Sequence, residues 1–218
     1  MNLFFDFVFT LLIAFLVWNH YKKHKSDPSV KYKTFPPRFW APSIDMLIFW
    51  PLFNLVPLVM NQLNLGVITT VIYGMINLSF YIYTIYFNWK FGGTYGKIYC
   101  KIKIVRNDNE KSISLKQAIL RDCVPVAAYL IFFFLSFLSG VFGGLQLPSY
   151  VVIVAFIPLL WFLAEIITML SNEKRRALHD YIAGTVVIRA DLENSQTEEP
   201  NKTLEEISSG SASRNSSV

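Results

Sequence analysis

The chain has 218 residues, of which 53% are hydrophobic and 16% are charged, and its net charge is +5 at pH 7. Soluble domains carry about 25% charged residues, so the composition favours a membrane protein. The excess of positive charge does not indicate nucleic acid binding, because the basic residues lie in short segments between apolar runs.

Five apolar segments approach the length of about 20 residues that a helix needs to cross a bilayer. They cover residues 3–18, 42–63, 67–89, 123–141 and 149–170. The first is short, and basic residues follow it instead of preceding it. This order predicts a retained transmembrane helix within residues 1–19 and not a cleaved signal peptide.

Basic and uncharged loops alternate along the chain. Lys and Arg occur in a linker at 20–35, between 90 and 121, and at 174–176, whereas 60–67 and 140–150 contain none. Short cytoplasmic loops carry an excess of Lys and Arg. The pattern therefore predicts five transmembrane helices in the plasma or inner membrane, with the N-terminus outside and the C-terminus in the cytoplasm.

The linker ends in Pro36-Pro37, which predicts an extended chain until the second span begins near Pro42. At the other end of the chain, residues 190–218 hold two basic and six acidic residues and almost no bulky apolar ones. This composition predicts a disordered acidic tail.

The basic segment between the third and fourth spans predicts structure of its own. Residues 97–105 alternate with the period of a strand, which would place Ile98, Cys100, Ile102 and Ile104 on one face. A turn follows at 107–109. The residues at 181–188 are also β-prone, and we expect the two runs to pair.

A helix is predicted after that turn. Ser114 and Gln117 have the spacing of a capping box. The helix that they open is expected to lie along the membrane surface until Pro125 directs the chain inward.

Three acidic residues, Asp6, Asp45 and Glu165, lie within apolar spans, where a charge is costly and often functional. The topology places Asp45 and Glu165 at similar depth near the cytoplasmic face. Their charge must be met by Lys or Arg, by a cation or by a proton. We expect Arg121 to pair with Asp45, and Arg38 to pair with Asp180, because Arg38 points away from Asp45 along the helix.

Four sequence blocks resemble those of the RDD family of membrane proteins. They are Pro37-Arg-Phe-Trp-Ala-Pro-Ser-Ile-Asp45, the segment from Gly92-Gly-Thr-Tyr-Gly-Lys97 to Val105, Ile113–Arg121, and Arg176-Ala-Leu-His-Asp-Tyr-Ile-Ala-Gly-Thr-Val-Val187. The resemblance implies that residues 36–189 form a four-helix membrane domain to which the first helix is added. The fold class is then an all-α membrane protein with a small cytoplasmic hairpin and interfacial helix.

The resemblance also implies which residues matter. Arg38, Asp45 and Asp180 correspond to the Arg and two Asp that give the family its name, and Lys97, Arg121 and His179 also fall on family positions. Some family members are reported to exchange sodium or potassium for protons, and in eukaryotes the domain occurs in an adaptor of a membrane quality-control complex.

Two functions remain open from the sequence. The first is a non-enzymatic scaffold that recruits partners through its cytoplasmic surface, in which the charged residues tie the helices together. The second is an antiporter of monovalent cations and protons that uses Asp45 and Glu165 and needs an oligomer, because four helices hardly enclose a pathway. Catalytic and metal-binding motifs are lacking, so we expect neither an enzyme nor a cofactor.

Overall fold

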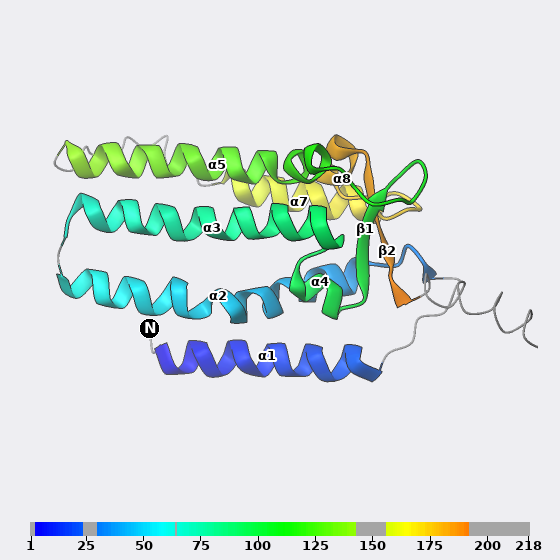
Figure 1. The fold of residues 1–218 in the computed structure, drawn as a ribbon, viewed down its shortest axis with the longest axis horizontal. Coiled ribbons are helices and arrows are strands. Elements are labelled where there is room, and N and C mark those ends of the chain that lie inside the picture. The colour runs from blue at the N-terminus through cyan, green and yellow to red at the C-terminus, as the bar shows by residue number, and fades with distance from the viewer. Residues whose placement is uncertain (1–2, 24–29, 64, 143–155, 192–218) are drawn as a thin grey trace, which may run out of the picture.

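The computed structural model describes residues 3–23, 30–63, 65–142 and 156–191. In this part of the chain, five long helices run nearly side by side (Figure 1). They are α1 (Leu3–Lys23), α2 (Phe35–Leu63), α3 (Val67–Phe91), α5 (Leu115–Val141) and α7 (Ile157–Leu170). The start of the fifth predicted span and most of the predicted acidic tail lie outside the described residues.

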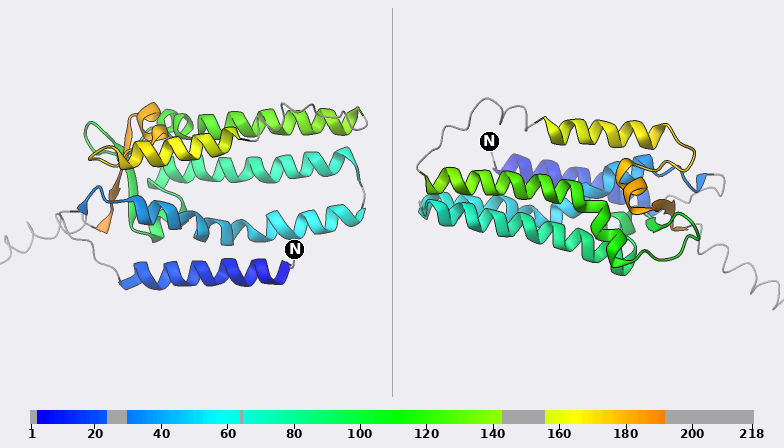
Figure 2. Two further views of the ribbon diagram at one scale, coloured as in Figure 1. Left: turned by 180° about the vertical axis from the view of Figure 1, so that it is seen from behind. Right: turned by 90° about the horizontal axis from the view of Figure 1, so that it is seen from above.

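The long helices form a bundle with an open arrangement. In Figure 1, α5, α3, α2 and α1 are stacked in that order, and each contacts the next. Figure 2 shows that α7 lies behind this layer, on one of its faces.

Of the helices that the structure describes, three are long and apolar enough to cross a membrane, namely Phe35–Met60, Val67–Phe91 and Leu115–Val141. Their large apolar side chains face outward, as Ile82 and Phe134 illustrate with exposed fractions of 60% and 58%. Such a surface would be unfavourable in water and is suited to lipid. These helices support the predicted membrane location, and α7 is a shorter apolar helix beside them.

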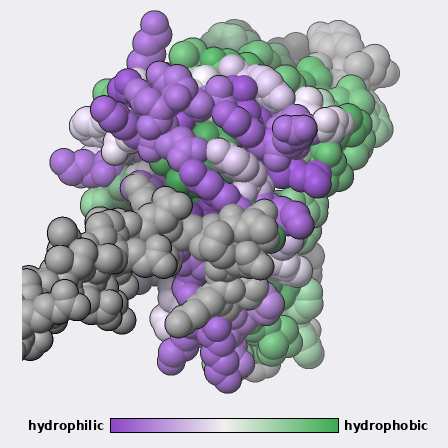
Figure 3. Space-filling model, turned by 90° about the vertical axis from the view of Figure 1, so that its right-hand side faces the viewer, coloured by the Kyte–Doolittle hydropathy of each residue, from purple (hydrophilic) through white to green (hydrophobic). Residues whose placement is uncertain are grey.

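The small elements gather at one end of the bundle (Figure 1). They are α4 (Tyr95–Tyr99), β1 (Ile102–Arg106), α8 (Leu178–Ala183) and β2 (Thr185–Arg189). We call these four elements the cap. Hydrophilic side chains cover this end of the molecule in Figure 3, so the cap is the part that faces water.

The cap and the residues next to it contain many of the most deeply buried side chains of the described residues. β1 pairs antiparallel with β2 so that Ile104 lies opposite Val187, which confirms the predicted pairing of the two β-prone runs. Cys100, Ile102, Ile104 and Val187 are all at most 1% exposed. Burial raises the pKa of the Cys100 thiol to about 12, so this cysteine is an inert core residue.

The predicted strand at 97–105 is wrong in its first half. Residues 95–99 form the helix α4, and the strand begins only at Ile102. Ile98 is 46% exposed and does not share the buried face of Cys100 and Ile102. The chain turns here because the backbone N–H of Gly96 is held by a carboxylate of α2, as described below. Likewise, residues 178–183 form α8, and β2 starts after Gly184, which caps α8 with φ of 65°.

The start of α2 also differs from the prediction. The helix begins at Phe35 and includes Pro36-Pro37, which we expected to be extended. Proline is tolerated in the first helical turn, because the N–H that it lacks would have no partner there. As a result Arg38 and Asp45 lie on one continuous helix. α1 is also longer than predicted and extends to Lys23.

The capping box that opens α5 is confirmed, with Gln117 N–H donating to Ser114 Oγ and Ser114 N–H donating to Gln117 Oε1. The helix continues without a break through Pro125 to Val141. Its first turns lie at an angle to the rest, as the right-hand view of Figure 2 shows. A proline inside a helix removes one backbone hydrogen bond and bends the axis.

Candidate functional site

Four elements meet at the carboxylate of Asp180, which is completely buried in α8. Arg38 of α2 donates from Nη1 to Asp180 Oδ2 over 2.6 Å, and Arg121 of α5 donates from Nη1 to Asp180 Oδ1. Thr185 of β2 donates its hydroxyl to Oδ1 over 3.0 Å, and the backbone N–H of Ala177 donates to Oδ2 over 3.1 Å. The predicted pairing of Arg38 with Asp180 is therefore confirmed.

The local sequence explains how Asp180 is presented. It is the third residue of α8, so its side chain reaches back to the N–H of the N-cap residue Ala177. Gly184 then turns the chain so that Thr185 enters β2 beside the same carboxylate.

Charge stabilises this carboxylate strongly. Burial alone would raise the pKa of Asp180, but the neighbouring Arg121 and Arg38 hold it well below its ordinary value. An ionised Asp180 between two guanidinium groups leaves a net positive charge. We call Arg38, Arg121 and Asp180 the Arg-Asp-Arg cluster.

Arg121 connects the cluster to Glu165 of α7. Its Nη2 lies 2.8 Å from His179 Nε2, and His179 Nδ1 lies 2.6 Å from Glu165 Oε1. A guanidinium only donates, so Nε2 accepts and the ring proton on Nδ1 is donated to Glu165. Glu165 is thus matched by a histidine and not by a Lys or Arg.

Asp45 lies apart from these ion pairs. Its carboxylate accepts hydrogen bonds from the Tyr83 hydroxyl at 2.8 Å, the Thr94 hydroxyl at 2.7 Å and the Gly96 N–H at 2.8 Å. All three donors are neutral, and Asp45 is only 4% exposed. The predicted pairing of Asp45 with Arg121 is wrong, because Arg121 is engaged by Asp180, Thr185 and His179.

Comparison with known proteins bears on this arrangement. The family model described as RDD family matches residues 32–184 of the chain. The chain belongs to the RDD family. No curated protein and no solved structure matches it.

The matched region contains all the elements just described except α1 and β2. Arg38 and Asp180, two of the three residues that the sequence resemblance relates to the family name, contact each other across 142 positions of sequence. Asp45, the third, joins α2 to α3 and α4 through neutral donors. These three residues thus join the elements of the fold at two separate places.

Lys97 of the glycine-rich RDD block lies between these two places. Its Nζ donates to Asn88 Oδ1 over 3.2 Å. Burial, and then the charge of Arg121, lower the pKa of Lys97 to about 8. No ion pair with a carboxylate forms at this ammonium group within the described part of the chain, so Lys97 is a partly buried cation with one neutral partner there.

The residues that sequence reasoning missed are the neutral ones. Tyr83, Thr94 and Thr185 carry no charge that would mark them inside a polar or apolar segment. Thr94 and Gly96 had one available signal, since they belong to the glycine-rich block of the RDD resemblance. Tyr83 had none, because Tyr is frequent throughout the third span.

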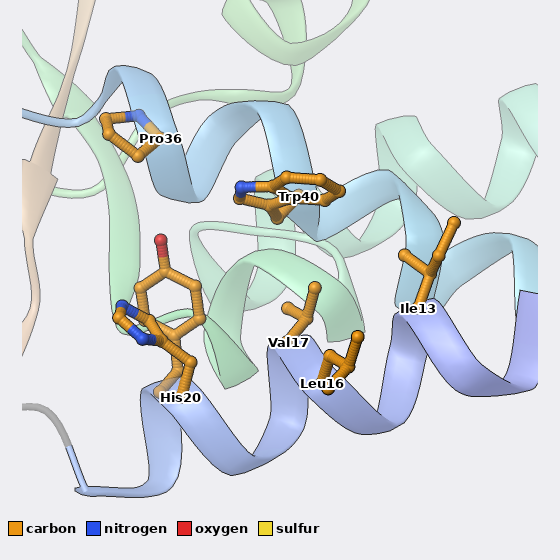
Figure 4. A pocket seen from close by; sticks show the side chains of 7 residues that line it. Ile13, Leu16, Val17, His20, Pro36 and Trp40 are labelled. Carbon is orange, nitrogen blue, oxygen red and sulfur yellow. The ribbon is translucent and has the colours of Figure 1, made fainter.

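A separate cavity of about 280 Å³ lies between α1 and α2 (Figure 4). Ile13, Leu16, Val17 and Trp40 make its wall mainly apolar, and His20 lies at one end of it. α1 stands outside the RDD match, and this cavity lies where α1 packs against the RDD domain.

Proposed function

We propose that this RDD protein is a non-enzymatic scaffold or accessory protein of the plasma (inner) membrane that recruits partners through its cap. The observation that carries the proposal is the Arg-Asp-Arg cluster, which joins α2, α5, α8 and β2 in one enclosed set of ion pairs. Buried ion pairs of this kind serve to fix the arrangement of elements. The partner is a membrane protein or a second copy of this chain.

The orientation follows from the distribution of basic residues. We propose five transmembrane spans, namely α1, α2, α3, α5 and the span predicted at 149–170, which includes α7. The cap and the chain segments next to it lie in the cytoplasm. The basic residues at 90, 97, 101 and 103 all lie at or near the cap, which supports this orientation.

The orientation predicts the labelling of single cysteines by a reagent that does not cross membranes. In a background that lacks Cys100 and Cys123, cysteine at position 64 or 146 should react in intact cells. Cysteine at position 108, in the turn of the cap after β1, should react only after the cells are permeabilised. Reaction at position 108 in intact cells would contradict the orientation.

A second candidate function is the exchange of monovalent cations for protons. The observation in its favour is Asp45, a buried carboxylate in a membrane helix whose hydrogen-bond partners are all neutral. Glu165, the other carboxylate that we considered for this role, is engaged by His179. We favour the scaffold, because the three donors around Asp45 satisfy it without a cation.

Replacing Asp45 by Asn separates the two functions. The amide oxygen still accepts from Tyr83 and Gly96, and the Thr94 hydroxyl rotates to accept from the amide nitrogen. We expect D45N to lose at most about 1 kcal/mol of stability, because no buried arginine loses its partner. Asp45→Ala, which strands three donors, should lose about 3 kcal/mol or more.

The decisive readout is proton movement in proteoliposomes when sodium or potassium is added. The scaffold proposal predicts that wild type and D45N both match empty liposomes. Cation-dependent proton flux by the wild type that D45N abolishes would establish the antiporter instead.

A further inference from the structure

A second pocket, of about 160 Å³, opens where α2, α7 and the cap meet. Its lining includes the basic side chains of Arg38, Lys97 and Arg121 and one carboxylate, Glu165. The pocket is large enough for a group of several heavy atoms, because one water takes up about 30 Å³ in the liquid.

The basic residues of the pocket have unused hydrogen-bonding capacity. Arg38 gives one nitrogen to Asp180, but its Nε and Nη2 are buried without a hydrogen-bond partner among the described residues. Within the ranges that the structure describes, Lys97 has a single hydrogen-bond partner, the neutral Asn88. Buried donors without acceptors are costly, and this cost would be removed by an anionic acceptor.

The carboxylate that lines the pocket does not neutralise its three basic side chains. Glu165 accepts the Nδ1 proton of His179, and Asp180 is shared by Arg38 and Arg121. Of the charged side chains that line the pocket, three are basic (Arg38, Lys97 and Arg121) and only Glu165 is acidic, so the lining itself carries an excess of positive charge. An arginine and a lysine that converge with spare donors suit the oxygens of a phosphate group.

The mouth of the pocket is apolar. Phe39 of α2 and Phe162 of α7 line it and are 53% and 51% exposed, on the helix surfaces that suit lipid. Arg38 lies in the first turns of α2, at the end of the bundle where the cap begins (Figure 1). This is the depth at which lipid headgroups meet acyl chains.

We propose that this pocket binds the phosphate group of an anionic phospholipid from the leaflet beside the cap, with the acyl chains along Phe39 and Phe162. The phosphate oxygens accept from Arg38 and Lys97, and the lipid holds α7 against α2. A soluble phosphate would make the same polar contacts but would leave the two phenylalanines uncovered.

Native mass spectrometry of the purified protein in non-ionic detergent tests the proposal, with phosphatidylglycerol, phosphatidylcholine and glycerol 3-phosphate as probes. We expect one phosphatidylglycerol to bind at least about tenfold more tightly than phosphatidylcholine, and glycerol 3-phosphate not to compete with it. Equal binding of the two lipids would overturn the site. Competition by glycerol 3-phosphate at similar concentrations would overturn the choice of a lipid.

Removing a positive charge from the pocket should weaken phosphatidylglycerol binding, and removing a negative charge should strengthen it. Lys97→Gln should weaken phosphatidylglycerol binding about tenfold, because one charge-assisted contact is lost. Glu165→Gln keeps the acceptor for His179 and removes a negative charge, so binding should tighten. Lys116→Gln, at an exposed position of α5 outside the pocket, is the matched control and should change nothing. Equal weakening by K97Q and K116Q, or weaker binding in E165Q, would contradict the proposal.

The pH dependence of phosphatidylglycerol binding is a further test of the site. The charged and titratable groups packed around Lys97 come from α2, α5, α7 and α8, and they are Arg38, Asp45, Arg121, Asp122, Glu165 and His179. The pKa of Lys97 is about 8, and its charged form favours an anion. Binding should therefore be steady up to pH 7 and weaken as the pH rises through 8, and K97Q should lack this loss. A pH profile shared by K97Q and wild type would show that Lys97 does not face the phosphate.

Discussion

Replacement of Asp180 by Asn is expected to destabilise the protein by about 3–5 kcal/mol, which is enough to prevent folding of many proteins. The substitution removes the negative charge that both Arg38 and Arg121 contact and leaves two buried guanidinium groups beside a neutral amide. The measurement is thermal stability in detergent, read from the loss of monodisperse protein on heating.

The matched control for D180N is Asp108→Asn, which makes the same chemical change in the exposed turn after β1. It should leave the stability within about 0.5 kcal/mol of wild type. Equal stability of D180N and D108N would mean that the Arg-Asp-Arg cluster does not hold the fold together.

Replacement of Gly96 by Ala is the second change with a large expected effect. A Cβ at this position would lie 2.1 Å from the carbonyl oxygen and 2.9 Å from the carbonyl carbon of Ala41, both backbone atoms of α2. Neither atom moves without displacing the helix, so α4 must shift away. We expect a loss of about 3 kcal/mol or more, because the shift also breaks the bond from Gly96 N–H to Asp45.

Gly140→Ala is the control for G96A. A Cβ at Gly140 in α5 meets only a methyl group of Val67 at 3.5 Å, an ordinary contact. Its thermal stability should be unchanged or slightly higher, because alanine favours a helix over glycine by about 1 kcal/mol. If G96A melts at the temperature of G140A, the close approach of α4 to α2 is not essential to the fold.

The long helices were predictable because hydropathy reports them directly. The same holds for the capping box of Ser114 and Gln117, which depends on spacing within one turn. The strand pairing was also predictable, since both runs are rich in the β-branched residues Ile and Val. All of these signals are local in the sequence.

The partners of the charged residues were harder to predict. Periodicity shows which face a residue occupies but not which of two nearby carboxylates it meets, and Arg121 was assigned to Asp45 when it pairs with Asp180. The deciding element is α8, a helix of six residues within a β-prone run. So short a helix is stabilised by its tertiary contacts and leaves little trace in the sequence.

Two errors concerned the glycine-rich segment and the proline pair. The alternation of residues 97–105 favoured a strand, but the bonds from Thr94 and Gly96 to Asp45 stabilise a helical turn instead. Pro36-Pro37 was expected to precede α2, although its first turn accommodates both. The local sequence allows two conformations in each segment. A tertiary contact decided between them in the glycine-rich segment, and the position at the start of a helix decided between them in the proline pair.

The most direct test of the structural role of the Arg-Asp-Arg cluster is a double-mutant cycle on Arg121 and Asp180. The stability of wild type, R121Q, D180N and the double variant would be measured in detergent. We predict that the double variant is at least about 2 kcal/mol more stable than the sum of the two single losses implies, because it no longer strands one charge of the pair. Losses that add within about 0.5 kcal/mol would show that the two residues are not coupled, and would contradict the account.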